Sequence, residues 1–194
     1  MRKSLKTWLR KNYSDFYWSL QIPFFANAIP AHLPSSVLFV CKGNICRSPF
    51  AEHLANKLAA QCRLTKMSIA SAGLRVIKPL SPPEQSITAA RFFGLDLSQH
   101  LSQSLDEKMV DDFNMIIVME PSQLKALSRA FPRARKKIFL LRNFGNKGKI
   151  LNHDVPRYTI PDPFGKSEAD FNACFKIIED CVVQLFSRDH PCLD

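Results

Sequence analysis

Uninterrupted runs of apolar residues alternate along the chain with segments in which apolar residues recur every three or four positions. The runs at 37–40 and 116–119 contain no polar residue, which is typical of strands buried on both faces of a parallel sheet. The spaced patterns between them indicate amphipathic helices. We expect strands at 37–40, 66–70, 115–119 and 137–140 and helices at 49–61, 84–93, 122–130 and 168–186. This alternation predicts the α/β class, with a central four-stranded parallel sheet covered by helices on both sides.

The first 35 residues follow a different pattern. Apolar residues recur there at helical spacing, which predicts an amphipathic helix that stops near Pro23, and further prolines mark a linker after it. The apolar stripe consists of Leu5, Trp8, Leu9, Tyr13, Phe16, Tyr17 and Leu20. We therefore divide the chain into an N-terminal extension with its linker, 1–35, and a globular domain, 36–194. The extension either packs on that domain or contacts an anionic membrane or a partner through residues 1–22.

The charge balance narrows the classes of partner. The chain has 27 Lys and Arg residues against 17 Asp and Glu residues, a formal net charge of +10, which favours phosphate groups, acidic peptides, nucleic acid or anionic membranes. No apolar run reaches the roughly 18 residues that a membrane span requires. Six cysteines are too few for a disulfide scaffold in a chain of 194 residues. We expect a cytoplasmic protein, either free in the cytoplasm or peripheral to the membrane.

The segment between the first predicted strand and the first predicted helix, 40–49, reads VCKGNICRSP. Ligands of open α/β sheets bind at the carboxyl ends of the strands. A loop there, with Gly43 and Asn44 able to adopt left-handed backbone conformations, can turn its N–H groups inward around an anion. These groups and the helix N-terminus favour the thiolate form of Cys41, a nucleophile. Arg47 follows in the same loop, and its planar guanidinium can hold two oxygens of a phosphate.

This loop, with its flanking strand and helix, resembles the phosphate-binding loop of the low-molecular-weight protein tyrosine phosphatases, whose pattern is VCxGNxCRSP. The resemblance extends over 36–187 and implies a flavodoxin-like three-layer sandwich. It also implies that Cys41 and Arg47 are catalytic and that no metal or cofactor takes part. The substrate-binding residues that it implies are Lys42, Gly43, Asn44, Ile45, Cys46, Ser48 and Phe164.

The long loop before the last predicted helix contains the sequence IPDPF at 160–164, which resembles the Asp-Pro-aromatic element of the same family. A thiolate alone displaces a phenolate poorly, so a general acid must protonate the leaving oxygen and later accept a proton from water. The resemblance implies that Asp162 does this and that Phe164 forms an aromatic wall beside the substrate ring. Asp154 is the alternative acid, but it lacks the Asp-Pro-aromatic order.

Other matches to the family concern the shape of the loop. Ser71 and His100 resemble residues that hydrogen-bond the loop asparagine, here Asn44, and Ser48 is expected to donate to the Cys41 thiolate. These contacts would position the loop and take no direct part in bond making.

Two features of the chain bear on specificity and redox behaviour. Where eukaryotic members of the family have a Trp, this chain reads LRVI at 74–77, so we expect an aliphatic wall, as in bacterial members associated with exopolysaccharide and capsule export. Cys46 either forms a reversible disulfide with Cys41, as the resemblance allows, or is inert. The remaining cysteines are expected to pack or to have no role: Cys62, Cys174, Cys181 and Cys192.

The function implied is hydrolysis of phosphotyrosine through a cysteinyl-phosphate intermediate. The expected partner is a phosphotyrosine protein, with a membrane tyrosine kinase of polysaccharide export as the candidate, and no nucleic acid, because no nucleic-acid-binding motif is recognised. Three alternatives stay open. A thioredoxin-coupled arsenate reductase needs further cysteines, which are absent between Cys62 and Cys174. A protein-arginine phosphatase is the second alternative, but such enzymes tend to have Thr at the position of Ile45. The third alternative is a catalytically silent anion- or nucleic-acid-binding module, which would use only the basic surface.

Overall fold

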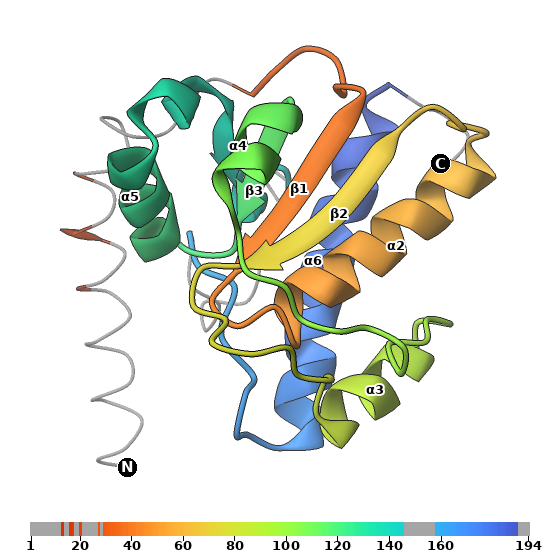
Figure 1. Ribbon diagram of the computed structural model, residues 1–194. Coiled ribbons are helices and arrows are strands. Elements are labelled where there is room, and N and C mark those ends of the chain that lie inside the picture. The colour runs from red at the N-terminus through yellow and green to blue at the C-terminus, as the bar shows by residue number, and fades with distance from the viewer. Residues whose placement is uncertain are drawn as a thin grey trace.

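A four-stranded parallel sheet with the order β2-β1-β3-β4 forms the centre of the protein. The computed structural model describes residues 29–145 and 158–189, together with Tyr13, Phe16, Tyr17, Leu20 and Asn27. The strands are β1 (Ser36–Cys41), β2 (Ser68–Gly73), β3 (Met115–Val118) and β4 (Ile138–Leu140). Helices cover both faces of the sheet (Figure 1), so the predicted α/β class and the three layers are confirmed.

The uninterrupted apolar run of β1 is explained by burial on both faces. Alternate residues of a strand point to opposite faces, and here Val37 and Phe39 belong to one core layer whereas Leu38 and Val40 belong to the other. None of the four has exposed surface. The first layer is completed by α2 (Arg47–Gln61), α3 (Glu84–Arg91) and α6 (Glu168–Ser187), and the second by α4 (Glu107–Asp112) and α5 (Pro121–Ala130).

Two boundaries differ from the prediction in ways that affect the site. Helix α2 begins at Arg47 and not at 49, so its first turn carries residues of the candidate phosphate loop. Pro49 is tolerated there because the first backbone N–H groups of a helix have no partner within the helix. Strand β2 extends to Gly73 and begins only at Ser68. The residues before it form a turn after α2, in which the Leu64 N–H donates to the carbonyl oxygen of Ala59 at 2.8 Å.

The hydrophobic pattern missed α4 and two 3₁₀ segments. Helix α4 has 6 residues and buries only Val110, so it has no repeating apolar stripe. Its start is marked by Asp106, whose side chain accepts a hydrogen bond from the Met109 N–H at 2.7 Å. The 3₁₀ segments are η2 (Pro132–Lys137) and η3 (Leu141–Asn143), before and after β4.

The structure describes only part of the N-terminal extension. Its described positions between 13 and 20 are helical and exposed, whereas Leu5, Trp8 and Leu9 of the predicted stripe lie outside the described residues. In the linker, Ile29 and Leu33 pack against the first core layer. The division of the chain at residue 35 stays a prediction. Within the part of the chain described, no helix is both long and apolar enough to span a membrane.

The topology places the loop after β1 at a special position of the sheet. Strand β1 pairs with β2 on one side and with β3 on the other, both in parallel register. The chain order therefore reverses at β1, and in open α/β sheets the crevice outside such a switch point is where ligands bind.

Candidate active site

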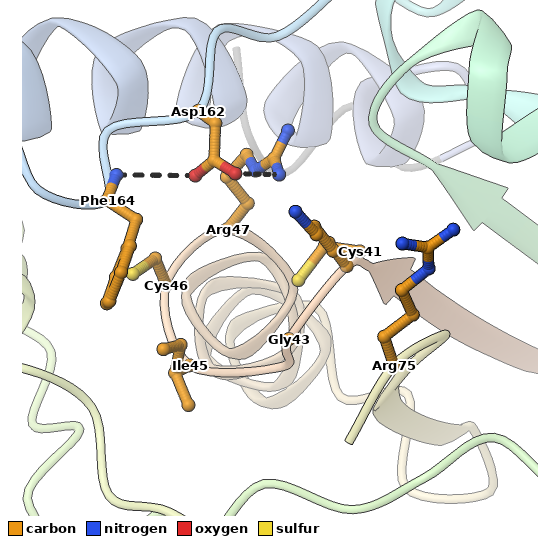
Figure 2. A pocket seen from close by; sticks show the side chains of 9 residues that line it. Cys41, Gly43, Ile45, Cys46, Arg47, Arg75, Asp162 and Phe164 are labelled. Carbon is orange, nitrogen blue, oxygen red and sulfur yellow. Dashed lines mark hydrogen bonds and ion pairs between the residues drawn. The ribbon is translucent and has the colours of Figure 1, made fainter. Parts of the chain in front are cut away.

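A cavity of about 200 Å³ opens at the carboxyl end of β1 (Figure 2). It joins three segments that are far apart in sequence: the loop from β1 to α2, the segment after β2 and the loop before α6. Its lining consists of Cys41, Lys42, Gly43, Ile45, Cys46, Arg47, Arg75, Asp162 and Phe164. The three residues expected to be catalytic thus share one cavity, together with most of those expected to bind substrate.

The two thiols of the loop have different surroundings. Cys41 Sγ accepts hydrogen bonds from the Asn44 N–H at 3.2 Å and from Ser48 Oγ at 3.1 Å, and it lies in front of the N-terminus of α2. Such donors stabilise negative charge on sulfur. Burial, together with the neighbouring Cys41, raises the pKa of Cys46 to about 12. Cys46 is therefore a neutral thiol at physiological pH, and the sulfur that accepts two hydrogen bonds at the floor of the loop belongs to Cys41.

Arg47 is buried, with 2% of its surface exposed, and its guanidinium is held from two sides. Nη2 donates to Asp162 Oδ2 at 2.7 Å, and Nη1 donates to the carbonyl oxygen of Ile160 at 3.2 Å. Glu120 Oε1 lies 3.6 Å from Nη1. Because an unpaired buried charge is very costly, these partners fix the guanidinium in one orientation beside Cys41.

Asp162 lies at the mouth of the cavity. Its side chain is 44% exposed, and while Oδ2 accepts from Arg47, Oδ1 accepts from the Phe164 N–H at 3.3 Å. The loop that carries it is anchored by Ile160, which is fully buried and whose N–H donates to the carbonyl oxygen of Met119 at 2.9 Å. A carboxyl group placed in this way can exchange protons with both a bound group and solvent. The alternative acid, Asp154, lies outside the described residues.

Asn44 is the centre of a buried network behind the loop. It has a φ of 54°, a left-handed conformation that Asn tolerates better than most residues. Its Nδ2 donates to Ser48 Oγ at 3.0 Å and to Ser71 Oγ at 2.7 Å, and its Oδ1 accepts from the Gln103 N–H at 2.9 Å. His100 Nε2 donates to its carbonyl oxygen at 3.0 Å. Every polar group of the Asn44 side chain is thus bonded, which fixes the shape of the loop.

Two titratable groups of this network have shifted pKa values. Burial lowers the pKa of His100, which favours the neutral imidazole that donates from Nε2. Burial also raises the pKa of Glu52, although Ser71 Oγ donates to its Oε2 at 2.6 Å. Glu52 and Gln103 gave no signal in the sequence, because an isolated polar residue is ordinary on a helix or in a loop. Only the packing of α2 and of the segment before α4 beside β2 connects them to the loop.

Two details of the predicted loop concern its backbone conformation and the place of its buried residues. Asn44 adopts the left-handed conformation, but Gly43 does not, and a Cβ on Gly43 would meet only the Ile45 side chain, at 3.7 Å. Asn44 and Ser48 are fully buried and are not among the lining residues, and the expectation that they bind substrate stays a prediction. From behind the loop, the Ser48 hydroxyl and the Asn44 backbone N–H donate to Cys41 Sγ, and the Asn44 side chain donates to Ser48 Oγ.

The predicted aliphatic wall is also wrong. Of the segment 74–77, the residue that lines the cavity is Arg75, while Ile77 is fully exposed to solvent.

The cysteine prediction needs one correction as well: Cys41, Cys46, Cys174 and Cys181 are free and buried, but Cys62 is disulfide-bonded.

Residues 36–190 match the family model described as low molecular weight phosphotyrosine protein phosphatase. The chain belongs to this family. The low-molecular-weight protein-tyrosine-phosphatase Ptp of Acinetobacter johnsonii is 31% identical to it over 147 residues, which cover 76% of this chain and 92% of the relative. As a member of the low-molecular-weight phosphatase family, the chain is a hydrolase.

Solved structures agree with this assignment and with the flavodoxin-like fold. The crystal structure of the Erwinia amylovora tyrosine phosphatase AmsI superimposes with a TM-score of 0.69 at 30% identity and covers 83% of this chain and 97% of its own. The Escherichia coli K30 tyrosine phosphatase Wzb, solved in complex with sulphate, gives a TM-score of 0.65 at 31% identity, with 77% of this chain and 94% of Wzb covered. The fold expected from the resemblance is confirmed.

Proposed function

We propose that this phosphatase hydrolyses phosphotyrosine on proteins through a cysteinyl-phosphate intermediate. The observation that carries the proposal is one cavity in which a hydrogen-bonded Cys41 sulfur, the buried Arg47 guanidinium and the half-exposed Asp162 carboxyl group meet. A nucleophile, a fixed cation for the phosphate oxygens and an acid at the mouth are the groups that phosphoryl transfer to a thiolate requires.

In the first step, Cys41 Sγ attacks phosphorus in line with the bond to the tyrosyl oxygen. That bond breaks as the sulfur–phosphorus bond forms, and the protonated form of Asp162 gives its proton to the leaving oxygen. Arg47 and the backbone N–H groups of the loop stabilise the charge on the equatorial oxygens. Phe164 and Ile45, both in the lining, would lie beside the substrate ring.

In the second step, water attacks the phosphorus of the cysteinyl phosphate and transfers a proton to the Asp162 carboxylate. The sulfur leaves as a thiolate, and the Ser48 hydroxyl, 3.1 Å from Cys41 Sγ, donates a hydrogen bond to it. Phosphate is released with Asp162 protonated again. Neither step requires a metal ion or a cofactor.

Turnover by the reduced full-length protein tests this function. We expect rapid release of phosphate from a phosphotyrosine peptide in the presence of EDTA, and slower release from a peptide of the same sequence with phosphoarginine. Ile45 lines the cavity where an arginine phosphatase tends to have Thr, and this difference favours the tyrosine substrate. Faster hydrolysis of phosphoarginine would favour the arginine phosphatase. Thioredoxin-dependent reduction of arsenate would favour the arsenate reductase. Absence of turnover with every substrate would favour a binding module.

We also propose that the enzyme acts in the cytoplasm at the membrane surface, on a membrane tyrosine kinase of polysaccharide export. Tyr13, Phe16, Tyr17 and Leu20 have the spacing of one helical face and are exposed, Tyr13 by 72% and Phe16 by 64%. The sequence of the extension adds five basic residues against one acidic residue. An exposed apolar face with basic neighbours is the composition of helices that lie in anionic membrane interfaces.

Sedimentation of the full-length protein with lipid vesicles tests the membrane contact. We expect binding to phosphatidylserine-containing vesicles and little binding to phosphatidylcholine alone. Phe16→Asp should weaken the binding about tenfold or more, the scale of one apolar side chain withdrawn from lipid. Ile77→Asp, at a fully exposed apolar position of the catalytic domain, is the matched control. Equal effects of the two substitutions would contradict the proposal.

A further inference from the structure

Arg75 lies at the cavity on the side of Cys41 away from Phe164 (Figure 2). Its backbone is tied to the phosphate loop. The Leu74 N–H donates to the carbonyl oxygen of Cys41 at 3.0 Å, and the Arg75 N–H donates to that of Lys42 at 2.9 Å. These two bonds tie the turn after β2 to the start of the loop that follows β1. The loop that holds the Cys41 sulfur therefore also fixes the position from which the Arg75 side chain extends.

Gly73 makes this close approach possible. A Cβ at Gly73 would lie 2.6 Å from Val76 Cγ2 and 3.1 Å from the backbone nitrogen of Asn44, both closer than ordinary contacts. The absence of a side chain thus lets the chain leave β2 directly against the loop. The backbone position of Arg75 is therefore fixed by close packing at Gly73 and by backbone hydrogen bonds to the phosphate loop.

The cations of the lining fall into two kinds. Arg47 is buried and paired with Asp162. Arg75 and Lys42 are exposed, and within the described part of the chain neither of them takes part in an ion pair. The cavity therefore has one buried cation suited to the phosphate that reacts and two exposed cations at its rim.

We propose that Arg75 is a specificity residue that binds a second anionic group of the substrate, on a residue next to the phosphotyrosine. This inference rests on the proposed function. When the tyrosine ring reaches into the cavity beside Phe164, the flanking residues of the peptide must pass the rim. The planar guanidinium of Arg75 can bind a carboxylate or a phosphate through two hydrogen bonds. Lys42 adds charge of the same sign, which attracts acidic segments.

Two sources supply such an anion, a neighbouring Asp or Glu residue or a second phosphotyrosine. Three phosphotyrosine peptides that differ only in the adjacent residue, Ala, Glu or phosphotyrosine, separate them. For the wild type we expect kcat/KM to be about threefold to fivefold higher for at least one anionic peptide than for the Ala peptide, the range of an exposed ion pair. The anionic peptide with the higher kcat/KM shows whether the anion that Arg75 binds is a carboxylate or a second phosphate.

Substitution of Arg75 then tests the assignment. In Arg75→Ala the advantage of the anionic peptides should vanish, and in Arg75→Glu it should reverse. The Ala peptide and a small aryl phosphate, which has no neighbouring residues, should be hydrolysed by Arg75→Ala at rates within about twofold of the wild type. Arg129→Ala removes the same charge from the last turn of α5, outside the lining, and should keep the preference.

Different failures have different meanings. If Arg75→Ala slows the aryl phosphate as much as the peptides, Arg75 serves the reacting phosphate or the fold, and the proposal is wrong. It is also wrong if the wild type treats all three peptides alike, or if Arg129→Ala abolishes the preference equally. If the wild type hydrolyses the peptides but Arg75→Ala keeps the same preference for the anionic ones, the specificity proposal fails while the proposed function stands. Absence of any turnover overturns both.

Discussion

Replacement of Cys41 by Ser is expected to abolish phosphotyrosine hydrolysis, with kcat lower by a factor of about 10⁴ or more, the scale of removing a covalent nucleophile. The substitution keeps a small side chain at the end of β1, where the Asn44 N–H and Ser48 Oγ can still donate to it. An alcohol, however, is almost entirely protonated at neutral pH, so these donors no longer stabilise an anion that attacks. Steady-state hydrolysis of a phosphotyrosine peptide by equally folded proteins measures the loss.

The matched control is Cys46→Ser, in the same loop. Burial raises the pKa of Cys46 to about 12, so this thiol stays protonated, and we expect its replacement to reduce kcat much less than replacement of Cys41. Rapid acid quenching of the wild type during turnover, followed by mass spectrometry, should find the phosphoryl group on Cys41. A phosphorylated Cys46, or equal losses in both variants, would contradict the assignment of the nucleophile.

The sequence was sufficient to predict the fold and to propose the reacting groups, because both leave local patterns. The run Val37 to Val40 is typical of a strand buried on two sides, and the loop after it contains both Cys41 and Arg47 within ten consecutive residues. Helix α4 left no such pattern, because a helix that buries one residue has no stripe. A short helix such as α4, held by one buried residue and one N-terminal cap, is stabilised by tertiary contacts. The spacing of apolar residues along the chain does not reveal such contacts.

The environment of the site was harder to predict than its reacting groups. Glu52 and Gln103 reach the loop only because α2 and the segment before α4 pack beside β2. The segment 74–77 was expected to be aliphatic by composition, but a turn after Gly73 directs Arg75 to the cavity and Ile77 to solvent. Which of four consecutive side chains faces a pocket depends on one backbone turn. That turn depends on the close packing of Gly73 against Val76 and Asn44. Such packing leaves no trace in the spacing of apolar residues along the sequence.

Replacement of Asp162 by Asn should lower kcat for a phosphotyrosine peptide by a factor of about 10² to 10³, the usual scale of a general acid. The amide keeps one oxygen that can accept from Arg47 Nη2 and gives up the longer bond from the Phe164 N–H, while the Ile160 N–H still anchors the loop to Met119, so the loop should keep its shape. It cannot give a proton to the leaving oxygen. Because the tyrosyl oxygen is a poor leaving group, with a phenol pKa of about 10, its departure depends strongly on that proton.

The dependence on the leaving group distinguishes an acid from a residue that merely positions Arg47. For an aryl phosphate whose phenol is more acidic than tyrosine, the leaving oxygen needs less help, so Asp162→Asn should slow it much less than the peptide. Glu120→Gln removes the other carboxylate near Arg47, 3.6 Å from Nη1, and is the matched control. It should affect both substrates equally and less than about tenfold. An equal loss on both substrates in Asp162→Asn would show that the carboxylate acts through Arg47 alone.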